Sequence, residues 1–386
     1  MLDFKALVTG VRGIRVSLKV PGSAQDGRFT FIDGLRGLAS LAVVFYHVNI
    51  AVSQARADWA PWLVSGAFTA GRYGVAVFFA LSGFVIAYSI RAARIGPAFV
   101  GRFVLRRALR LDPPYVASIA LTIVLTMISV RLFPDLVKEY PSALKVLAHV
   151  FYLQDLLRMG NIVDVYWTLC LEVQFYLLLV VLLGLVRHAA RHRADGRWGA
   201  SAFFIVAFPA TFVVSVLQYY QVIAIAPPGT FLPFWFYFLP GALAWWTLNR
   251  DIAPGWFAGA AVLSLGGFTA RWIGGWCDAG PALTIITASL ILLAGRRGSL
   301  GRWLAPRSLQ YLGTISYSLY LIHPIIGWRA VSVAKILFGP DLTRPEAWLA
   351  FAIGLAASLV GSHVFYCIVE RPSHEISRLV GLATRS

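Results

Sequence analysis

Residues 31–53 have the sequence FIDGLRGLASLAVVFYHVNIAVS, and the part after Arg36 contains no Asp, Glu, Lys or Arg. Such a run is typical of a membrane-spanning helix, because a hydrocarbon core ~30 Å thick takes roughly 20 helical residues. Two ionisable residues stand out: Arg36 precedes the run and His47 lies inside it. This stretch therefore predicts a membrane helix with ionisable side chains at two depths.

The composition of the whole chain agrees with this interpretation. Of its 386 residues, 59% are apolar and only 13% are charged, and the mean hydropathy is +0.72. An ordinary soluble domain has roughly 25% charged residues. The formal charge of +17 does not indicate nucleic-acid binding, because the basic residues collect in short gaps between apolar runs and cover no folded face. We expect the lipid bilayer, and no nucleic acid, as a partner.

Further apolar runs follow the first one, and together they predict an all-α, polytopic integral membrane protein with about ten transmembrane helices. The predicted spans lie near residues 37–53, 72–90, 113–131, 165–186, 199–217, 231–248, 254–271, 281–296, 313–333 and 347–368.

The placement of arginine predicts the orientation of these helices. The gaps 91–112, 187–198 and 296–307 are rich in arginine and are expected in the cytoplasm, whereas the alternate gaps hold most of the loop acids and are expected outside. An even number of spans returns the chain to the side on which it began, so both termini are expected in the cytoplasm. Residues 1–28 lack the long apolar core of a removable signal peptide, which agrees with a cytoplasmic N-terminus. We expect a multi-pass protein of the cell (inner or plasma) membrane.

Segment 142–159 is apolar enough to suggest an eleventh span. A crossing there would move the arginines of 187–198 outside, so we expect an interfacial or re-entrant helix on the outer side. The chain then divides into a cytoplasmic N-terminal segment at 1–30, a transmembrane domain at 31–372 and a cytoplasmic tail at 373–386.

His47 follows Arg36 by eleven residues, or about three helical turns, so both side chains are expected on one helix face. Arg36 then lies at the inner surface and His47 ~15 Å from it, near the middle of the membrane. An ionisable residue at that depth normally faces the protein interior. His47 is therefore either a functional base in its neutral form or a structural hydrogen-bonding residue between helices.

A polar stripe opens the fourth predicted span, where Thr168, Glu172 and Tyr176 recur at four-residue spacing. If this helix enters from outside, Glu172 lies ~19 Å from the inner face, close to the depth of His47. A buried carboxylate beside an imidazole fixes its tautomer and stabilises the imidazolium. We expect Glu172 either to orient His47 or to form a structural hydrogen bond with another helix.

The gap between the second and third spans contains Arg106, Arg107 and Arg110. Guanidinium groups match phosphate oxygens in geometry, although membrane topology alone also demands positive charge there. Phosphate binding therefore stays one of two interpretations of these arginines.

A second polar group lies in GTISYSLYLIHP, residues 313–324, where Ser316, Tyr320 and His323 share roughly one helix face. These residues suit core packing and a substrate pocket equally well. The three cysteines, Cys170, Cys277 and Cys367, have no metal-ligand spacing, so we expect no metal site.

In its ordered motifs the chain resembles the acyltransferase-3 family of membrane-bound O-acyltransferases. The likeness rests on FIDGLRGLASLAVVFYHV, YGVAVFFALSGFVI, FVLRRALRLDPPYV and YWTLCLEVQFYLLL, which occur in the family's order, with weaker matches at TISYSLYLIHP and FYCIVERPSHEI.

The resemblance implies a reaction. An acyl group, commonly acetyl, is expected to pass from cytoplasmic acyl-coenzyme A to a hydroxyl of a glycan, a lipid-linked sugar or another small acceptor, as in polysaccharide modification. No metal is required, because a thioester is already activated and positioning with one base supplies much of the rate.

The resemblance also implies roles for the polar residues. His47 is expected as base or acyl carrier, with Glu172 and Arg36 completing the catalytic group. The coenzyme's phosphates are expected on Arg36, Arg106, Arg107 and Arg110, and the substrate on Tyr176, Ser316, Tyr320 and His323.

A multi-span transporter or flippase is the main alternative, since buried His47 and Glu172 also suit a proton relay. Many transporters contain inverted repeats and paired broken helices, and the sequence has no visible internal repeat.

Overall fold

The computed structural model describes residues 29–91, 96–132, 140–191, 208–227, 229–273, 275 and 278–381. Within these ranges the regular structure is helical and contains no strand. The predicted N-terminal segment lies almost wholly outside the described residues, as does Cys277.

Each of the ten predicted spans overlaps a helix, although residues 199–207 of the fifth span lie outside the described residues. These helices are α2 (Thr30–Ser53), α4 (Gly74–Ser89), α5 (Pro97–Leu132), α7 (Tyr166–Arg191), α9 (Phe208–Tyr219), α10 (Trp235–Leu248), α11 (Pro254–Ile273), α12 (Gly280–Arg296), α14 (Ser316–Phe338) and α15 (Arg344–Phe365). Short helices lie between them, namely α3 (Trp62–Ala70), α6 (Ala143–Val150) and α13 (Arg307–Thr314), and the short helix α16 (Arg371–Arg378) follows the last one.

Five helical stretches of the described chain are long and apolar enough to cross a membrane. They are Thr30–Ser53, Trp62–Ser89, Pro97–Leu132, Ser316–Phe338 and Arg344–Arg378, and shorter apolar helices occupy Tyr166–Leu182 and Gly280–Arg296. The chain is thus a helical membrane protein. The total of ten spans and the cytoplasmic placement of the termini stay predictions.

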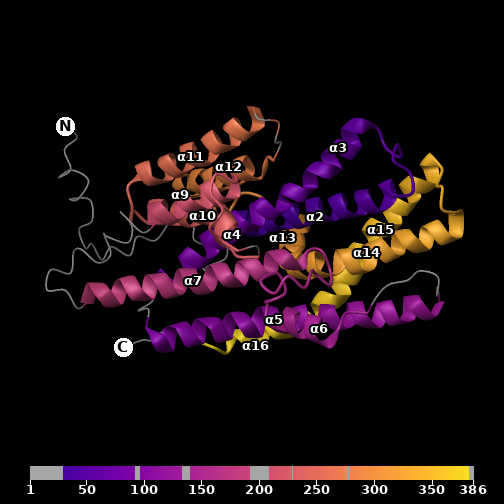
Figure 1. Cartoon of the computed structure of the whole chain (residues 1–386), viewed down its shortest axis with the longest axis horizontal. Helices are drawn as coiled ribbons and strands as arrows, with labels where there is room; N and C mark the ends of the chain where they lie inside the picture. Colours follow the sequence, from indigo (N-terminus) through magenta and orange to yellow (C-terminus); the bar gives the residue numbers. More distant parts are fainter. Residues whose placement is uncertain are drawn as a thin grey trace.

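Helix α2 joins two helical groups. It packs against α4 on one side, and α4 in turn packs against α10 and α12. On its other side α2 contacts α13, α14 and α15. Figure 1 shows the α9–α12 group and the α14–α15 pair at opposite ends of the molecule, with α5 and α7 running along its length. The ionisable residues of α2 therefore lie between the two groups.

Two glycines allow α4 and α10 to cross at close range. A Cβ at Gly83 would lie 1.9 Å from the carbonyl oxygen of Phe238, and one at Gly241 would lie 1.8 Å from that of Ala80. Small residues at such a crossing let helix backbones approach closely, and the resulting van der Waals packing contributes to helix association in lipid. Gly83 thus has a packing role in this crossing.

We expect Gly83→Ala to lower the stability of the detergent-solubilised protein by about 1–3 kcal/mol, because a methyl group there meets a backbone carbonyl that cannot rotate away. Thermal unfolding measures this. Gly259→Ala in α11 is the matched control, since nothing lies within 4 Å of its Cβ position. Equal melting temperatures for the two variants would contradict the close crossing.

Segment 142–159 forms the eight-residue helix α6 followed by a turn-rich loop, so it contains no helix long enough to cross a membrane. His149 fixes this loop: its Nδ1 donates to the Lys145 oxygen at 2.7 Å, and its Nε2 accepts from the Ile162 backbone N–H at 3.0 Å. Burial lowers the pKa of His149, which agrees with the neutral ring that this pattern needs.

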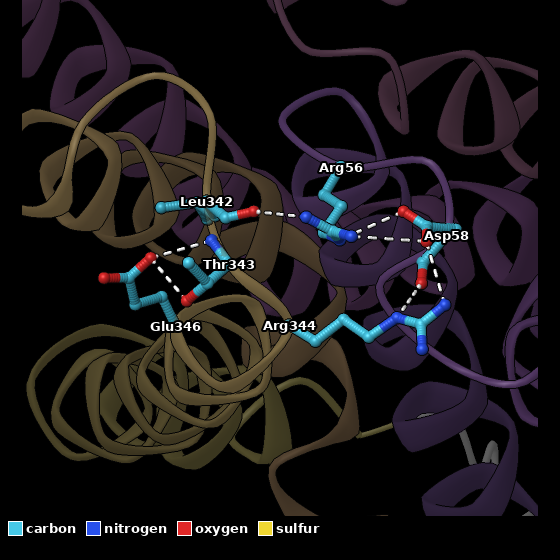
Figure 2. A network of polar contacts seen from close by, with 6 residues as sticks. All are labelled: Arg56, Asp58, Leu342, Thr343, Arg344 and Glu346. Carbon is cyan, nitrogen blue, oxygen red and sulfur yellow. Dashed lines mark hydrogen bonds and ion pairs between the residues drawn. The ribbon is translucent and has the colours of Figure 1, made fainter.

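A polar network connects the α2–α3 loop to the α14–α15 loop (Figure 2). Asp58 accepts from Arg344 at 2.9 Å and pairs with Arg56 at 3.0 Å, while Arg56 donates to the Leu342 oxygen at 3.2 Å. Next to this network, Glu346 accepts from both the backbone and the hydroxyl of Thr343 at 2.7 Å, which caps α15. These contacts hold together two loops far apart in sequence.

The hydrogen bond from Arg344, with Arg56 adding to it, lowers the pKa of Asp58. A lowered pKa in the folded state stabilises the protein above the ordinary carboxyl pKa of ~4, and this contribution is lost as pH falls through the lowered value. We therefore expect Asp58→Asn to lower the melting temperature at pH 7, with the difference from the parent protein shrinking toward pH 3.

Glu375→Gln is the control for this prediction. It breaks an exposed ion pair of 3.0 Å with Arg371 within α16, a pair that joins no separate segments. A pH-independent effect of Asp58→Asn, or one no larger than that of Glu375→Gln, would contradict the assigned role.

Candidate active site

A cavity of about 600 Å³ lies among α2, α4, α5, α7 and α14 and is lined by four arginines; we call it the arginine cavity. Its polar wall contains Arg36, Arg106, Arg107, Arg110, Glu172, Ser82, Ser89, Thr168, Ser316, Tyr317 and Tyr320, and its apolar wall includes Val75, Phe78, Phe79, Leu81, Val85, Phe103, Leu111 and Leu169. The structure thus brings together Arg36 and the α5 arginines, the four residues expected to bind the coenzyme's phosphates, and their role stays a prediction.

The arginine cavity is positively charged. Of the four guanidinium groups in its wall, only that of Arg107 has a carboxylate partner within the described chain: Glu172, at 3.2 Å. Arg110 lies within electrostatic range of Arg36 and Arg107 as well as Glu370 and Glu172. Cations that the protein leaves unpaired make a site for an anionic ligand.

Glu172 belongs to this arginine cavity, and of the two roles expected for it the structure shows the hydrogen bond with another helix and not the contact with His47. The carboxylate accepts from the Ser82 hydroxyl at 2.8 Å and from Arg107 at 3.2 Å. Although the two residues have similar expected depths, Glu172 faces α4 and α5, whereas His47 lines a different cavity. A membrane carboxylate that faces a guanidinium avoids the cost of an unpaired buried charge.

Tyr176 lies one turn further along α7 and is not among the residues that line the arginine cavity. Its ring supports the guanidinium of Arg107, whose central carbon lies 4.7 Å from the ring centroid. Arg107 is thus held by a carboxylate and an aromatic face. In this structure Tyr176 positions an arginine, in place of the substrate contact that we expected.

Glu370 is a charged residue of this region that the sequence analysis did not single out. It lies in a single π-helical turn, Tyr366–Glu370, and is buried. Its carboxylate accepts from the backbone N–H of Ser318 at 2.9 Å and from its hydroxyl at 2.5 Å, which caps the N-terminus of α14. The closing FYCIVERPSHEI motif contained the signal. Glu370 therefore fixes the helix that carries Ser316, Tyr320 and His323.

A second cavity, of about 730 Å³, contains His47 in its wall; we call it the histidine cavity. Its wall is formed by α2, α5, α6, α14 and the α6–α7 loop and includes Thr122, Thr126, Tyr140, Ser142, Lys145, Asn161, Asp164, Pro324, Ile325, Trp328, Arg329 and Ser332. The two side chains that the sequence placed on one face of α2, Arg36 and His47, thus line separate cavities.

His47 and His323 form a hydrogen-bonded pair, and contacts with the helix backbone determine which ring nitrogen of each carries the proton. Nδ1 of His323 lies 2.8 Å from the Leu319 oxygen, so it carries a proton and leaves Nε2 as an acceptor. That Nε2 lies 3.1 Å from Nδ1 of His47, which itself lies 2.9 Å from the Val43 oxygen. Nδ1 of His47 is therefore the protonated nitrogen, and its Nε2 is free to accept a proton.

A thin layer of side chains separates the two cavities along α14. Ser316, Tyr317 and Tyr320 line the arginine cavity, and Pro324 begins the wall of the histidine cavity. Between them, the Tyr320 hydroxyl lies 2.6 Å from that of Thr168, and buried His323 contacts His47. Ser316 and Tyr320 thus line a cavity as the substrate-pocket interpretation required, whereas His323 is buried in the layer.

The fold and the two cavities define a membrane-embedded protein with an arginine-lined cavity on one side of a histidine pair. The family model of the acyltransferase-3 domain matches residues 29–367. The chain belongs to the acyltransferase-3 family and is an enzyme that transfers acyl groups other than amino-acyl groups.

Two named relatives are similar over most of this chain. A putative membrane-bound transacylase, BcsY of Komagataeibacter xylinus, is 28% identical over 371 residues, which are 92% of this chain and 85% of the relative. The O-acetyltransferase OatA of Staphylococcus aureus is 25% identical over 329 residues, which are 76% of this chain and 50% of OatA. The match thus spans about half the length of OatA. No solved structure matches this chain.

Proposed function

We propose that this enzyme is a membrane O-acyltransferase that moves an acyl group, in the first instance acetyl, from coenzyme A in the arginine cavity to an acceptor hydroxyl in the histidine cavity. The observation that carries this proposal is the arrangement of the two cavities on either side of the layer formed by Thr168, Tyr320 and His323. The family and the O-acetyltransferase among its relatives support the same reaction.

The arginine cavity suits the donor in charge and in shape. A phosphate-bearing coenzyme needs guanidinium groups without carboxylate partners, which Arg36, Arg106 and Arg110 provide. The apolar remainder of the wall, from Val85 to Phe78, suits the pantetheine arm. The cytoplasmic position predicted for the arginine-rich gap agrees with a cytoplasmic donor.

His47 acts as the general base in this mechanism. Its free Nε2 takes the proton of the acceptor hydroxyl as that oxygen attacks the thioester carbonyl. The carbon–sulfur bond then breaks, and the departing thiolate takes the proton back from the imidazolium, which yields the ester and the coenzyme thiol. His323 acts as a positioning residue, because its Nε2 accepts the Nδ1 proton of His47. For the thioester to reach His47, the contact between Thr168 and Tyr320 has to open.

A proton-coupled transporter gains no support from this geometry. A relay through His47 and Glu172 requires contact between them, but Glu172 is paired with Arg107 and Ser82. Acyl transfer needs His47 and His323 alone near the reacting atoms, and this pair is present.

We expect His47→Ala to reduce acetyl transfer by about 10²–10⁴-fold, the contribution typical of a general base, while the protein still folds. The experiment uses the full chain in nanodiscs with acetyl-labelled coenzyme A and a panel of sugar acceptors, and it follows release of the free thiol. Near-normal turnover of the variant would contradict the role of His47 as general base.

Two substitutions of His323 complete this experiment. His323→Ala removes one of the two acceptors of the His47 Nδ1 proton and leaves the Val43 oxygen, and we expect turnover to fall about tenfold or more with a changed pH profile. His323→Gln keeps an acceptor oxygen and should restore part of the activity. Equal losses in both variants, with an unchanged pH profile, would indicate a packing role only.

We expect Arg110→Gln to raise the KM for acetyl-coenzyme A about tenfold, because one charge-assisted contact with phosphate is lost. The maximal rate should change little, and high salt should reduce the difference between variant and parent. Arg296→Gln removes an equal charge at the exposed end of α12, outside the cavity wall, and is the control. An unchanged KM for Arg110→Gln would place the phosphates elsewhere.

A further inference from the structure

The histidine cavity contains two cations for which the proposed chemistry has no use. Arg329 of α14 and Lys145 of α6 both line its wall, and both are half-buried. Neither forms an ion pair with any carboxylate in the part of the chain that the structure describes. Their charges therefore need another explanation.

Arg329 lies within α14, one of the helices long and apolar enough to cross a membrane. It is thirteen residues from the first residue of the 23-residue helix α14, or ~20 Å along the axis. Its guanidinium donates to the Ile325 oxygen at 2.8 Å and to the Thr126 hydroxyl at 3.0 Å, and both acceptors are neutral. A guanidinium has five N–H donors. These two contacts therefore leave most of its donors unused, and neither contact neutralises its charge.

Membrane topology does not account for this arginine. Positive charges that set orientation collect on the cytoplasmic side, whereas Arg329 lies in the outer half of its predicted span, 313–333, and beside a cavity. An ionisable residue within a membrane helix usually faces the protein interior or a water-filled cavity and marks a substrate or ion pathway.

The wall of the histidine cavity has a net positive charge. Its two cations, Arg329 and Lys145, outnumber its described carboxylate, that of the exposed Asp164, so with a neutral His47 the net charge is +1. The cavity volume of about 730 Å³ falls in the usual range of small-molecule sites, ~300–1,000 Å³.

We infer that the histidine cavity selects an acceptor with a negative group, a carboxylate or a phosphate, near the hydroxyl to be acylated, and that Arg329, assisted by Lys145, binds this group. The inference rests on the proposed function, because it names the class of the acceptor for the same reaction. An anion fixed on α14 holds the acceptor against the helix that also carries His323, which orients the base.

The test compares three sugar acceptors that differ in charge: methyl glucoside, methyl glucuronide and glucose 6-phosphate. We expect the anionic sugars to have a kcat/KM at least about tenfold above that of the glucoside, through a lower KM, as one charge-assisted contact provides. A comparison of methyl glucuronide with glucose 6-phosphate shows whether a carboxylate or a phosphate is preferred. Arg329→Gln should bring the ratio of anionic to neutral acceptors close to one, and Lys145→Gln should reduce it less.

Two further variants separate charge from fold. Arg329→Lys keeps the cation and should keep most of the selectivity. Arg131→Gln removes an exposed cation at the end of α5, outside the cavity wall, and should leave the ratio unchanged. Equal kcat/KM for neutral and anionic sugars in the parent protein, or an unchanged ratio in Arg329→Gln, would overturn the inference.

A binding measurement keeps this test independent of turnover. A ligand that binds the folded protein raises its melting temperature, so glucuronide or glucose 6-phosphate should stabilise the parent protein at lower concentration than the glucoside does, and Arg329→Gln should abolish this difference. If acetyl-coenzyme A neither stabilises the protein nor is turned over with any acceptor, the proposed function fails. The difference between charged and neutral sugars still decides the inference about Arg329.

Discussion

An ionisable side chain in a membrane helix is stable only where protein or water surrounds it, and the architecture of this enzyme follows from that constraint. Arg36, Arg106 and Arg110 face a cavity, Arg107 faces a carboxylate, and His47 faces another histidine. None of these groups requires contact with lipid. The helices carrying them have to pack around a polar centre, and the apolar crossing of α4 and α10 at Gly83 and Gly241 forms outside that centre.

The two cavities share one wall, helix α14. Its first turn is fixed by Glu370, the middle contains Tyr320 and His323, and Arg329 lies beyond them. A helix is rigid along its axis, so the arginine cavity, the layer and the histidine cavity keep a fixed spacing along α14. The short layer between the cavities matters because acyl transfer requires the reacting atoms within about 3–3.5 Å of each other.

Helix periodicity and apolar run length were sufficient to predict where the helices lie, because each predicted span holds a helix. The same periodicity placed Arg36 and His47 on the inward face of α2. It did not predict the partner of Glu172. Depth along a helix is set by residue number, but the direction in which a side chain faces across the bundle depends on which helices are neighbours, and neighbouring helices are set by tertiary packing. Glu172 faces Arg107 and Ser82 because α7 packs beside α4 and α5. Glu370 escaped notice for the same reason, since its role depends on contact with α14, 52 residues away.

The pairing of His47 with a second histidine, in place of a carboxylate, follows from the same cost of buried charge. A carboxylate next to His47 would bring a full negative charge into a layer that otherwise contains hydroxyl groups, aromatic rings and imidazoles, whereas His323 can accept the Nδ1 proton while both rings are neutral. In a catalytic triad a carboxylate orients the imidazole ring. Here the helix backbone orients both rings, because His47 donates to the carbonyl of Val43 and His323 to that of Leu319, in each case four residues earlier. Those carbonyls belong to rigid backbone, so the tautomers are set by secondary structure. In the proposed mechanism the base is thereby ready in its neutral form without any buried ion beside it, and the positive charge that would appear on His47 during transfer would be short-lived, because the departing thiolate would take the proton.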